Sequence, residues 1–203
     1  VEAELENRWK SAEEADRIIR LEKEKRAIMG FEEEAEEYRR LIGQIICDEN
    51  LETEEYPSWY RSLNEGVFNE LYGLAGLAPW AYDETDKYKN SSSAKLIGDR
   101  LYCLIDGVSR LQPQTISARR REQLKRALLM SDPRERLDVG FHEVYLRNGI
   151  RITVYSGERT KDGQDVMVFR KYIMQNYNFE ELARMGTIEK EAAELFKTMV
   201  EIG

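Results

Sequence analysis

The sequence predicts an α+β fold in which an N-terminal helical region precedes a small antiparallel sheet with packed helices. Three observations carry this prediction. Apolar residues recur at helical spacing up to residue 47, alternation replaces that spacing after a polar stretch at 83–93, and helical spacing returns at 179. The expected strands lie in blocks rather than alternating one by one with helices, which favours α+β over α/β.

The N-terminal region is expected to form acidic helices over 1–29 and 31–47. Val1, Leu5 and Trp9 lie along one side of the first helix, and charged residues cover its other faces. A helix with so narrow an apolar seam needs a partner, either within the chain or on another subunit.

The segment 67–82 is rich in apolar and aromatic residues and predicts another helix, which Pro79 should end. The polar, serine-containing stretch 83–93 is the best linker candidate in the chain. We therefore expect a domain boundary there.

A β-hairpin is expected where Asp106-Gly107 separates two apolar runs, because a type I′ turn needs positive φ at both central residues. The next segment, 116–130, reads as a helix with Ser117 as its N-cap.

A three-stranded meander is expected next, with strands over 139–146, 150–155 and 166–172. Asn148-Gly149 provides the first turn. Along 150–155 the even-numbered residues are apolar and share one face, while Arg151 and the other odd-numbered residues share the opposite face.

The tail, 176–203, holds two expected helices separated by Gly186. We thus expect three parts: an acidic helical region at 1–90, an α+β domain at 94–175 and a helical connector at 176–203. The charge is uneven, with nine Lys and Arg against eighteen Asp and Glu in residues 1–60, and 22 against 21 in residues 61–203.

The composition argues against several functions. With two cysteines and a single histidine, a zinc site of three His or of mixed Cys and His is not expected within one chain. Cys47 and Cys103 are expected to be free, buried or half-buried thiols in a reducing compartment, and His142 an ordinary strand residue. No apolar run is long enough to span a membrane, and the acidic start is not a secretory signal.

No GxxxxGK[ST], GxGxxG or GxSxG motif is present, so we assign no catalytic residues and expect the chain alone not to be an enzyme. The first residue is not Met, which suggests a piece of a longer protein.

The most specific pattern lies in the last third of the chain. Gly149-Ile150-Arg151-Ile152 follows a tight turn, Val168-Phe169-Arg170-Lys171 ends the last strand, and NFEELARMGTIEKEAAELF forms a helix-Gly-Thr-helix segment. In their order and spacing these motifs resemble the N-terminal region of type II and type IV secretion ATPases, especially those that assemble Tad/Flp pili. The resemblance covers roughly residues 94–203.

This resemblance implies that the chain is the non-catalytic N-terminal domain of a hexameric secretion or pilus-assembly ATPase and stops before the Walker A loop. Arg151, Arg170 and Lys171 would contact the nucleotide in the full-length protein. A guanidinium suits this role, since its planar fork of donors matches phosphate oxygens. ATP and Mg²⁺ would be cofactors of the full-length ATPase only, and the chain alone should bind nucleotide weakly or not at all.

The implied partners are the protein's own C-terminal ATPase domain, neighbouring subunits and an inner-membrane platform protein. The implied location is cytoplasmic, at the inner face of the cell membrane. The sequence departs from the family in two respects: the loop 155–165 lacks a proline-containing stretch, and the first 90 residues lie outside the common pattern.

Two other functions remain open. The chain could be a protein-interaction or oligomerisation module that binds no nucleotide. It could also bind nucleic acid, or an acidic partner, through a basic helix whose candidate residues are Arg119, Arg120, Arg121, Lys125 and Arg126. The overall acidity and the lack of exposed-looking aromatic residues on a basic sheet face count against nucleic acid.

Overall fold

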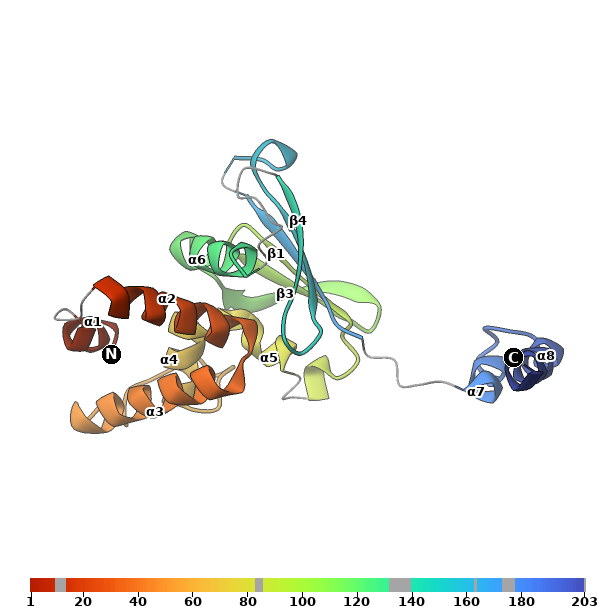
Figure 1. The fold of residues 1–203 in the computed structure, drawn as a ribbon, viewed down its shortest axis with the longest axis horizontal. Helices are drawn as coiled ribbons and strands as arrows, with labels where there is room; N and C mark the ends of the chain where they lie inside the picture. Colours follow the sequence, from red (N-terminus) through yellow and green to blue (C-terminus); the bar gives the residue numbers. More distant parts are fainter. Residues whose placement is uncertain (10–13, 83–85, 132–139, 163, 173–177, 203) are drawn as a thin grey trace. The chain divides into compact units, whose positions relative to one another are not determined.

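The computed structural model describes residues 1–9, 14–82, 86–131, 140–162, 164–172 and 178–202. It contains helices and a six-stranded antiparallel sheet, which confirms the predicted α+β class (Figure 1). The chain divides into two compact units, Val1–Tyr172 and Ile173–Gly203. The boundary expected near residue 93 therefore falls inside the first unit.

The first unit begins with a cluster of helices that pack on one another. Tyr38 stacks on Tyr72 with ring centroids 4.1 Å apart and meets Trp9 edge to face at 6.4 Å. The apolar seams thus find their partners within the chain, around buried residues such as Ile42 and Phe68. The helices are α1 (Glu2–Trp9), α2 (Glu14–Met29), α3 (Glu32–Asp48), α4 (Leu63–Tyr72) and α5 (Ala78–Ala81).

One expectation for this region is tested only in part, and another needs correction. The residues described within the predicted helix 1–29 are helical, in α1 and α2, and residues 10–13 between them lie outside the described ranges. Pro79 does not end a helix but lies in the first turn of α5, where its missing N–H breaks no hydrogen bond. The preceding helix, α4, has already ended at Gly73.

The sheet has the strand order β3-β2-β1-β6-β5-β4, and every neighbouring pair is antiparallel. Strand β1, which lies in the middle of the sheet, was not predicted from the sequence, because its first residue was assigned to the linker at 83–93. The strands are β1 (Ser93–Ile97), β2 (Arg100–Ile105), β3 (Val108–Thr115), β4 (Phe141–Tyr145), β5 (Arg151–Tyr155) and β6 (Val166–Arg170).

The predicted turns and strand faces are present. Asp106 and Gly107 both have positive φ, 51° and 76°, as a type I′ hairpin requires. The meander of β4, β5 and β6 forms as expected, and Ile152 and Val154 of β5 are fully buried. The odd-numbered residues of β5 therefore face outward.

Within the described residues of the first unit, helices pack against one face of the sheet. Helix α6 (Ala118–Leu129) begins after its predicted N-cap, Ser117, whose hydroxyl accepts from the Arg120 N–H at 3.2 Å. Its buried leucines join the inward residues of the sheet, the end of α2 and the segment 74–81 in one core. The outward face carries no packed element among the described residues of this unit.

The second unit contains α7 (Phe179–Arg184) and α8 (Lys190–Ile202). Asn178 and Glu181 form a capping box at the start of α7, and Gly186 follows its end with φ of 74°. The rings of Phe179 and Phe196 lie 5.7 Å apart and join the two helices.

Arg120 of α6 connects the sheet layer to the helical cluster. Its side chain is only 6% exposed, and Nη2 donates to the Gly73 carbonyl at 2.6 Å and to the Asn69 carbonyl at 3.4 Å. These carbonyls lie at the C-terminal end of α4, where a cation is favoured. Burial lowers the pKa of Arg120 to about 10, so the guanidinium is still charged at neutral pH.

We predict that Arg120→Ala lowers the free energy of unfolding by about 2 kcal/mol or more, because it removes charge-assisted hydrogen bonds and leaves buried carbonyls unpaired. Arg119→Ala is the matched control, since Arg119 is exposed and only pairs with Glu2 at 3.1 Å. The control should change stability by about 0.5 kcal/mol or less. Urea unfolding followed by circular dichroism measures both, and an equally small loss in the two variants would contradict the role of Arg120.

Candidate functional site

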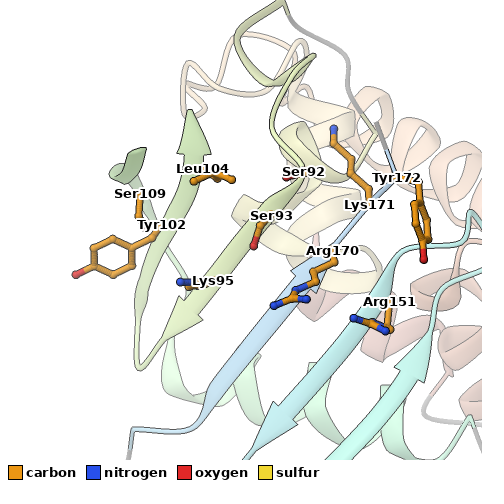
Figure 2. A pocket seen from close by; sticks show the side chains of 10 residues that line it. All are labelled: Ser92, Ser93, Lys95, Tyr102, Leu104, Ser109, Arg151, Arg170, Lys171 and Tyr172. Atoms are coloured by element: carbon orange, nitrogen blue, oxygen red, sulfur yellow. The ribbon is translucent and has the colours of Figure 1, made fainter. Parts of the chain in front are cut away.

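A hollow of about 460 Å³ lies on the outward face of the sheet, within the first unit. Figure 2 shows the side chains around it, which come from β1, β2, β3, β5 and β6 and from the segments that follow or precede them. The lining residues are Ser92, Ser93, Lys95, Tyr102, Leu104, Ser109, Arg151, Arg170, Lys171 and Tyr172.

Two arginines lie side by side at one end of this hollow. Arg151 and Arg170 are direct cross-strand partners on β5 and β6, and Arg170 is paired on its other side with Ser93 of β1. Figure 2 shows both side chains extending over the same side of the sheet. Like charges directly opposite each other are unfavourable, so an anion bound between them would relieve their repulsion.

No carboxylate among the described residues neutralises this pair; neither guanidinium has an ion pair or side-chain hydrogen bond there. The carboxylate nearest in register is that of Glu143 on β4, which is opposite Thr153 of β5. Glu143 accepts a hydrogen bond from the Tyr145 hydroxyl at 2.9 Å instead. Among the described residues, no side chain therefore competes with an anion for the donors of these two guanidinium groups.

The third predicted contact residue, Lys171, is placed differently. Its ammonium donates to the Trp80 carbonyl at 2.9 Å and lies 5.0 Å from the centre of the Trp80 ring. In Figure 2 it extends away from the two guanidinium groups. The structure therefore brings Arg151 and Arg170 together and directs Lys171 to the helical side.

The basic residues of α6 do not form one open patch. Arg120 is buried, as described above. Lys125 donates to Asp165 at 2.6 Å and pairs with Glu122 at 2.8 Å, and Arg126 pairs with the same Glu122 at 3.1 Å. Most of the charge expected to meet nucleic acid or an acidic partner is thus already balanced within the chain.

One argument from the sequence proves wrong. Aromatic side chains do lie on the outward, basic face of the sheet, because alternation places Tyr102, Tyr145, Tyr155 and Phe141 there. Phe141 and Tyr155 contact each other with ring centroids 5.4 Å apart. A lack of aromatic side chains therefore no longer counts against nucleic-acid binding. A surface that bound nucleic acid through these rings would lie on the sheet rather than on α6.

Sequence reasoning missed the part of the hollow that β1 and β2 provide. Lys95 of β1 is directly opposite Tyr102 of β2, and both face outward. The signal was present: Ala94 and Leu96 alternate with polar or exposed residues. The alternation was overlooked because the serines just before it favoured a linker over a strand.

Metal binding finds no support in the described ranges, which contain no cluster of three or more His, Cys, Asp or Glu side chains that could hold an ion. His142 is fully buried in β4. The hollow offers cationic and hydroxyl donors, which fit the phosphate groups of ATP but not Mg²⁺, whose ligands are oxygen acceptors. Among the helices described, none is long and apolar enough to cross a membrane.

Comparison with solved structures finds several chains that resemble this one, and one of them can be described. The chain is similar to the VirB11 ATPase from the Brucella suis type IV secretion system, solved in complex with sulphate, with 15% sequence identity and a TM-score of 0.46. The match covers 56% of this chain and 34% of that one, so it spans about a third of the solved chain. No family model matches the sequence, and no curated protein matches it.

The two cysteines differ sharply in exposure. Cys103 is fully buried in β2, and burial raises the pKa of its thiol to about 12. Cys47 is an exposed free thiol near the end of α3. It is thus more exposed than the buried or half-buried thiol that the sequence predicted. Since the thiolate is the reactive form, only Cys47 should be reactive near neutral pH.

We predict that a thiol reagent such as 5,5′-dithiobis(2-nitrobenzoate) labels one cysteine of the folded protein at pH 8 and two after unfolding in guanidinium chloride. Cys47→Ser is the control and should show no labelling until the protein unfolds. Fast labelling of that folded variant would show that Cys103 is accessible and that the sheet packs differently.

Proposed function

We propose that this chain is the non-catalytic N-terminal part of a hexameric secretion or pilus-assembly ATPase, and that its outward sheet face supplies Arg151 and Arg170 to the phosphate groups of a nucleotide. The observation that carries the proposal is the cross-strand arginine pair, which lies at an open hollow without a carboxylate partner among the described residues. A pair of guanidiniums is a strong, directional receptor for phosphate.

In this proposal the full-length protein is the ATPase, and ATP with Mg²⁺ is held by its C-terminal ATPase domain. The outward face lacks a packed element among the described residues, so it is available to meet that domain. Arginines brought to a nucleotide by a separate domain can couple hydrolysis to domain motion. The chain would work in the cytoplasm, with neighbouring subunits and an inner-membrane platform protein as partners.

Support for the two alternatives is unequal. The nucleic-acid alternative through α6 is weakened by the burial of Arg120 and the pairing of Lys125 and Arg126 with carboxylates. A protein-interaction module without nucleotide binding remains the rival, because exposed apolar side chains such as Ile97 and Leu111 also lie on the outward face.

We predict that the chain binds inorganic tripolyphosphate weakly, and that the double variant Arg151→Ala/Arg170→Ala reduces the affinity at least tenfold, because charge-assisted hydrogen bonds contribute roughly 1.5–3 kcal/mol each. Isothermal titration calorimetry at low salt measures the binding. The control Arg119→Ala/Arg126→Ala removes the same charge from α6 and should bind nearly as well as the unchanged chain. An equal loss in both double variants would indicate a general charge effect and contradict a site at the arginine pair.

The ATPase assignment makes a separate prediction about the gene. The coding sequence should continue past codon 203 with an apolar strand and a GxxxxGK[ST] motif within about a dozen residues. Sequencing the locus checks this. A stop codon at that point would contradict the assignment and favour the interaction module.

A further inference from the structure

The arginine pair lies at the ends of its two strands, where a sheet holds its residues least firmly. Arg151 is the first residue of β5, and Arg170 is the last residue of β6. Their like charges repel across the strand pair, and the ends of elements open more readily than their centres. A phosphate receptor built from these two side chains therefore needs support from outside the sheet.

We propose that the helical cluster supplies this support, through one contact beside each arginine. The first contact joins Arg147 to Phe31, and the second joins Lys171 to Trp80. The inference rests on the proposed function, because it takes the arginine pair as the phosphate receptor. It goes further by assigning a task to the N-terminal helices, which lie outside the resemblance to secretion ATPases.

The hairpin contact, between Arg147 and Phe31, holds the turn that leads into β5. The backbone N–H of Arg147 donates to the Met29 carbonyl at 2.9 Å, and its guanidinium carbon lies 5.4 Å from the centre of the Phe31 ring. The guanidinium of Arg26 covers the same ring at 3.9 Å. The turn between α2 and α3 thus holds the β4–β5 hairpin four residues before Arg151 (Figure 1).

The strand-end contact, between Lys171 and Trp80, holds the end of β6. The ammonium of Lys171 donates to the Trp80 carbonyl at 2.9 Å, and its backbone N–H donates to the Ser92 carbonyl at 3.0 Å. Trp80 is 1% exposed, and its indole N–H donates to the buried Ser91 hydroxyl at 2.8 Å. The ammonium therefore binds a group that is itself fixed, directly after Arg170.

Both contacts act on the backbone beside an arginine rather than on the ligand. Phe31 and Arg147 do not line the hollow, and Lys171 extends away from the two guanidinium groups in Figure 2. Loss of either contact should let its strand end open and the two guanidiniums move apart. An anion that needs both would then bind less tightly, although each arginine is still present.

The test measures affinity for inorganic tripolyphosphate by isothermal titration calorimetry at low salt, and hydrogen exchange of the backbone amides of β5 and β6. Phe31→Ala and Lys171→Met should each reduce the affinity about fivefold, which is part of the contribution of one charge-assisted hydrogen bond. Each should also speed exchange at its own strand end. Phe31→Tyr keeps the ring and Lys171→Arg keeps a cationic donor, so both should stay within about twofold of the unchanged chain.

Two control variants separate positioning from stability and from charge. Trp9→Ala removes another half-buried ring that an arginine covers, at 4.7 Å, and that packs on Tyr38 of α3. Lys125→Met removes one positive charge and an ion pair with Asp165, which precedes the other end of β6. Both controls should change the affinity by about twofold or less. The change at Phe31 is neutral, so a loss of affinity there cannot come from net charge.

The outcomes distinguish this inference from the function on which it rests. Suppose that Arg151→Ala/Arg170→Ala loses binding, while Phe31→Ala and Lys171→Met keep full affinity and unchanged exchange. The inference would then be overturned and the phosphate receptor would stand. Equal losses in the control variants would also overturn it, because any loss of stability would then have the same effect. Absence of binding by the unchanged chain would contradict the phosphate receptor, and hydrogen exchange would still decide whether the two contacts hold the strand ends.

Discussion

The hydrogen bonds from Arg120 to the end of α4 join the two halves of the first unit. The guanidinium lies among backbone carbonyls and near the carboxylates of Glu70 and Glu24, which favour its charged form despite burial. A buried cation is costly unless it is paired and hydrogen-bonded. The position of α6 is therefore tied to that of α4, and since α6 covers the inner face of the sheet, the same contact fixes the sheet against the helical cluster.

Because helices pack on the inner face of the sheet, its two faces differ in burial and in chemistry. The inner face is filled by one continuous apolar core, including Trp80 and Phe169, while the outer face carries arginines and aromatic rings that are half-buried or exposed. Lys171 connects the two. Its side-chain ammonium donates to the Trp80 carbonyl on the helical side, and its backbone N–H donates to the Ser92 carbonyl at 3.0 Å. Both contacts hold the end of β6, where the preceding residue presents its guanidinium outward.

The sequence correctly predicted the parts of the fold that depend on interactions between residues close together in the chain. The type I′ turn at Asp106-Gly107, the N-cap at Ser117 and the two faces of β5 depend on backbone conformation or on alternation within a few residues. The errors came where distant contacts decide. Strand β1 is stabilised by its neighbours on both sides, and Arg120 is buried because of carbonyls some fifty residues away, so neither could be inferred from its own segment.

The candidate site follows the same division. Alternation placed Arg151 on the outward face, but only the strand order puts it beside Arg170, nineteen residues later, and puts β1 and β2 next to that pair. Two adjacent guanidiniums without a carboxylate partner among the described residues raise the free energy of the folded chain, since like charges repel across a strand pair. A ligand that binds only the folded state offsets that cost in proportion to its concentration over its dissociation constant. The arrangement is thus more readily explained by a bound anion than by the stability of the sheet alone.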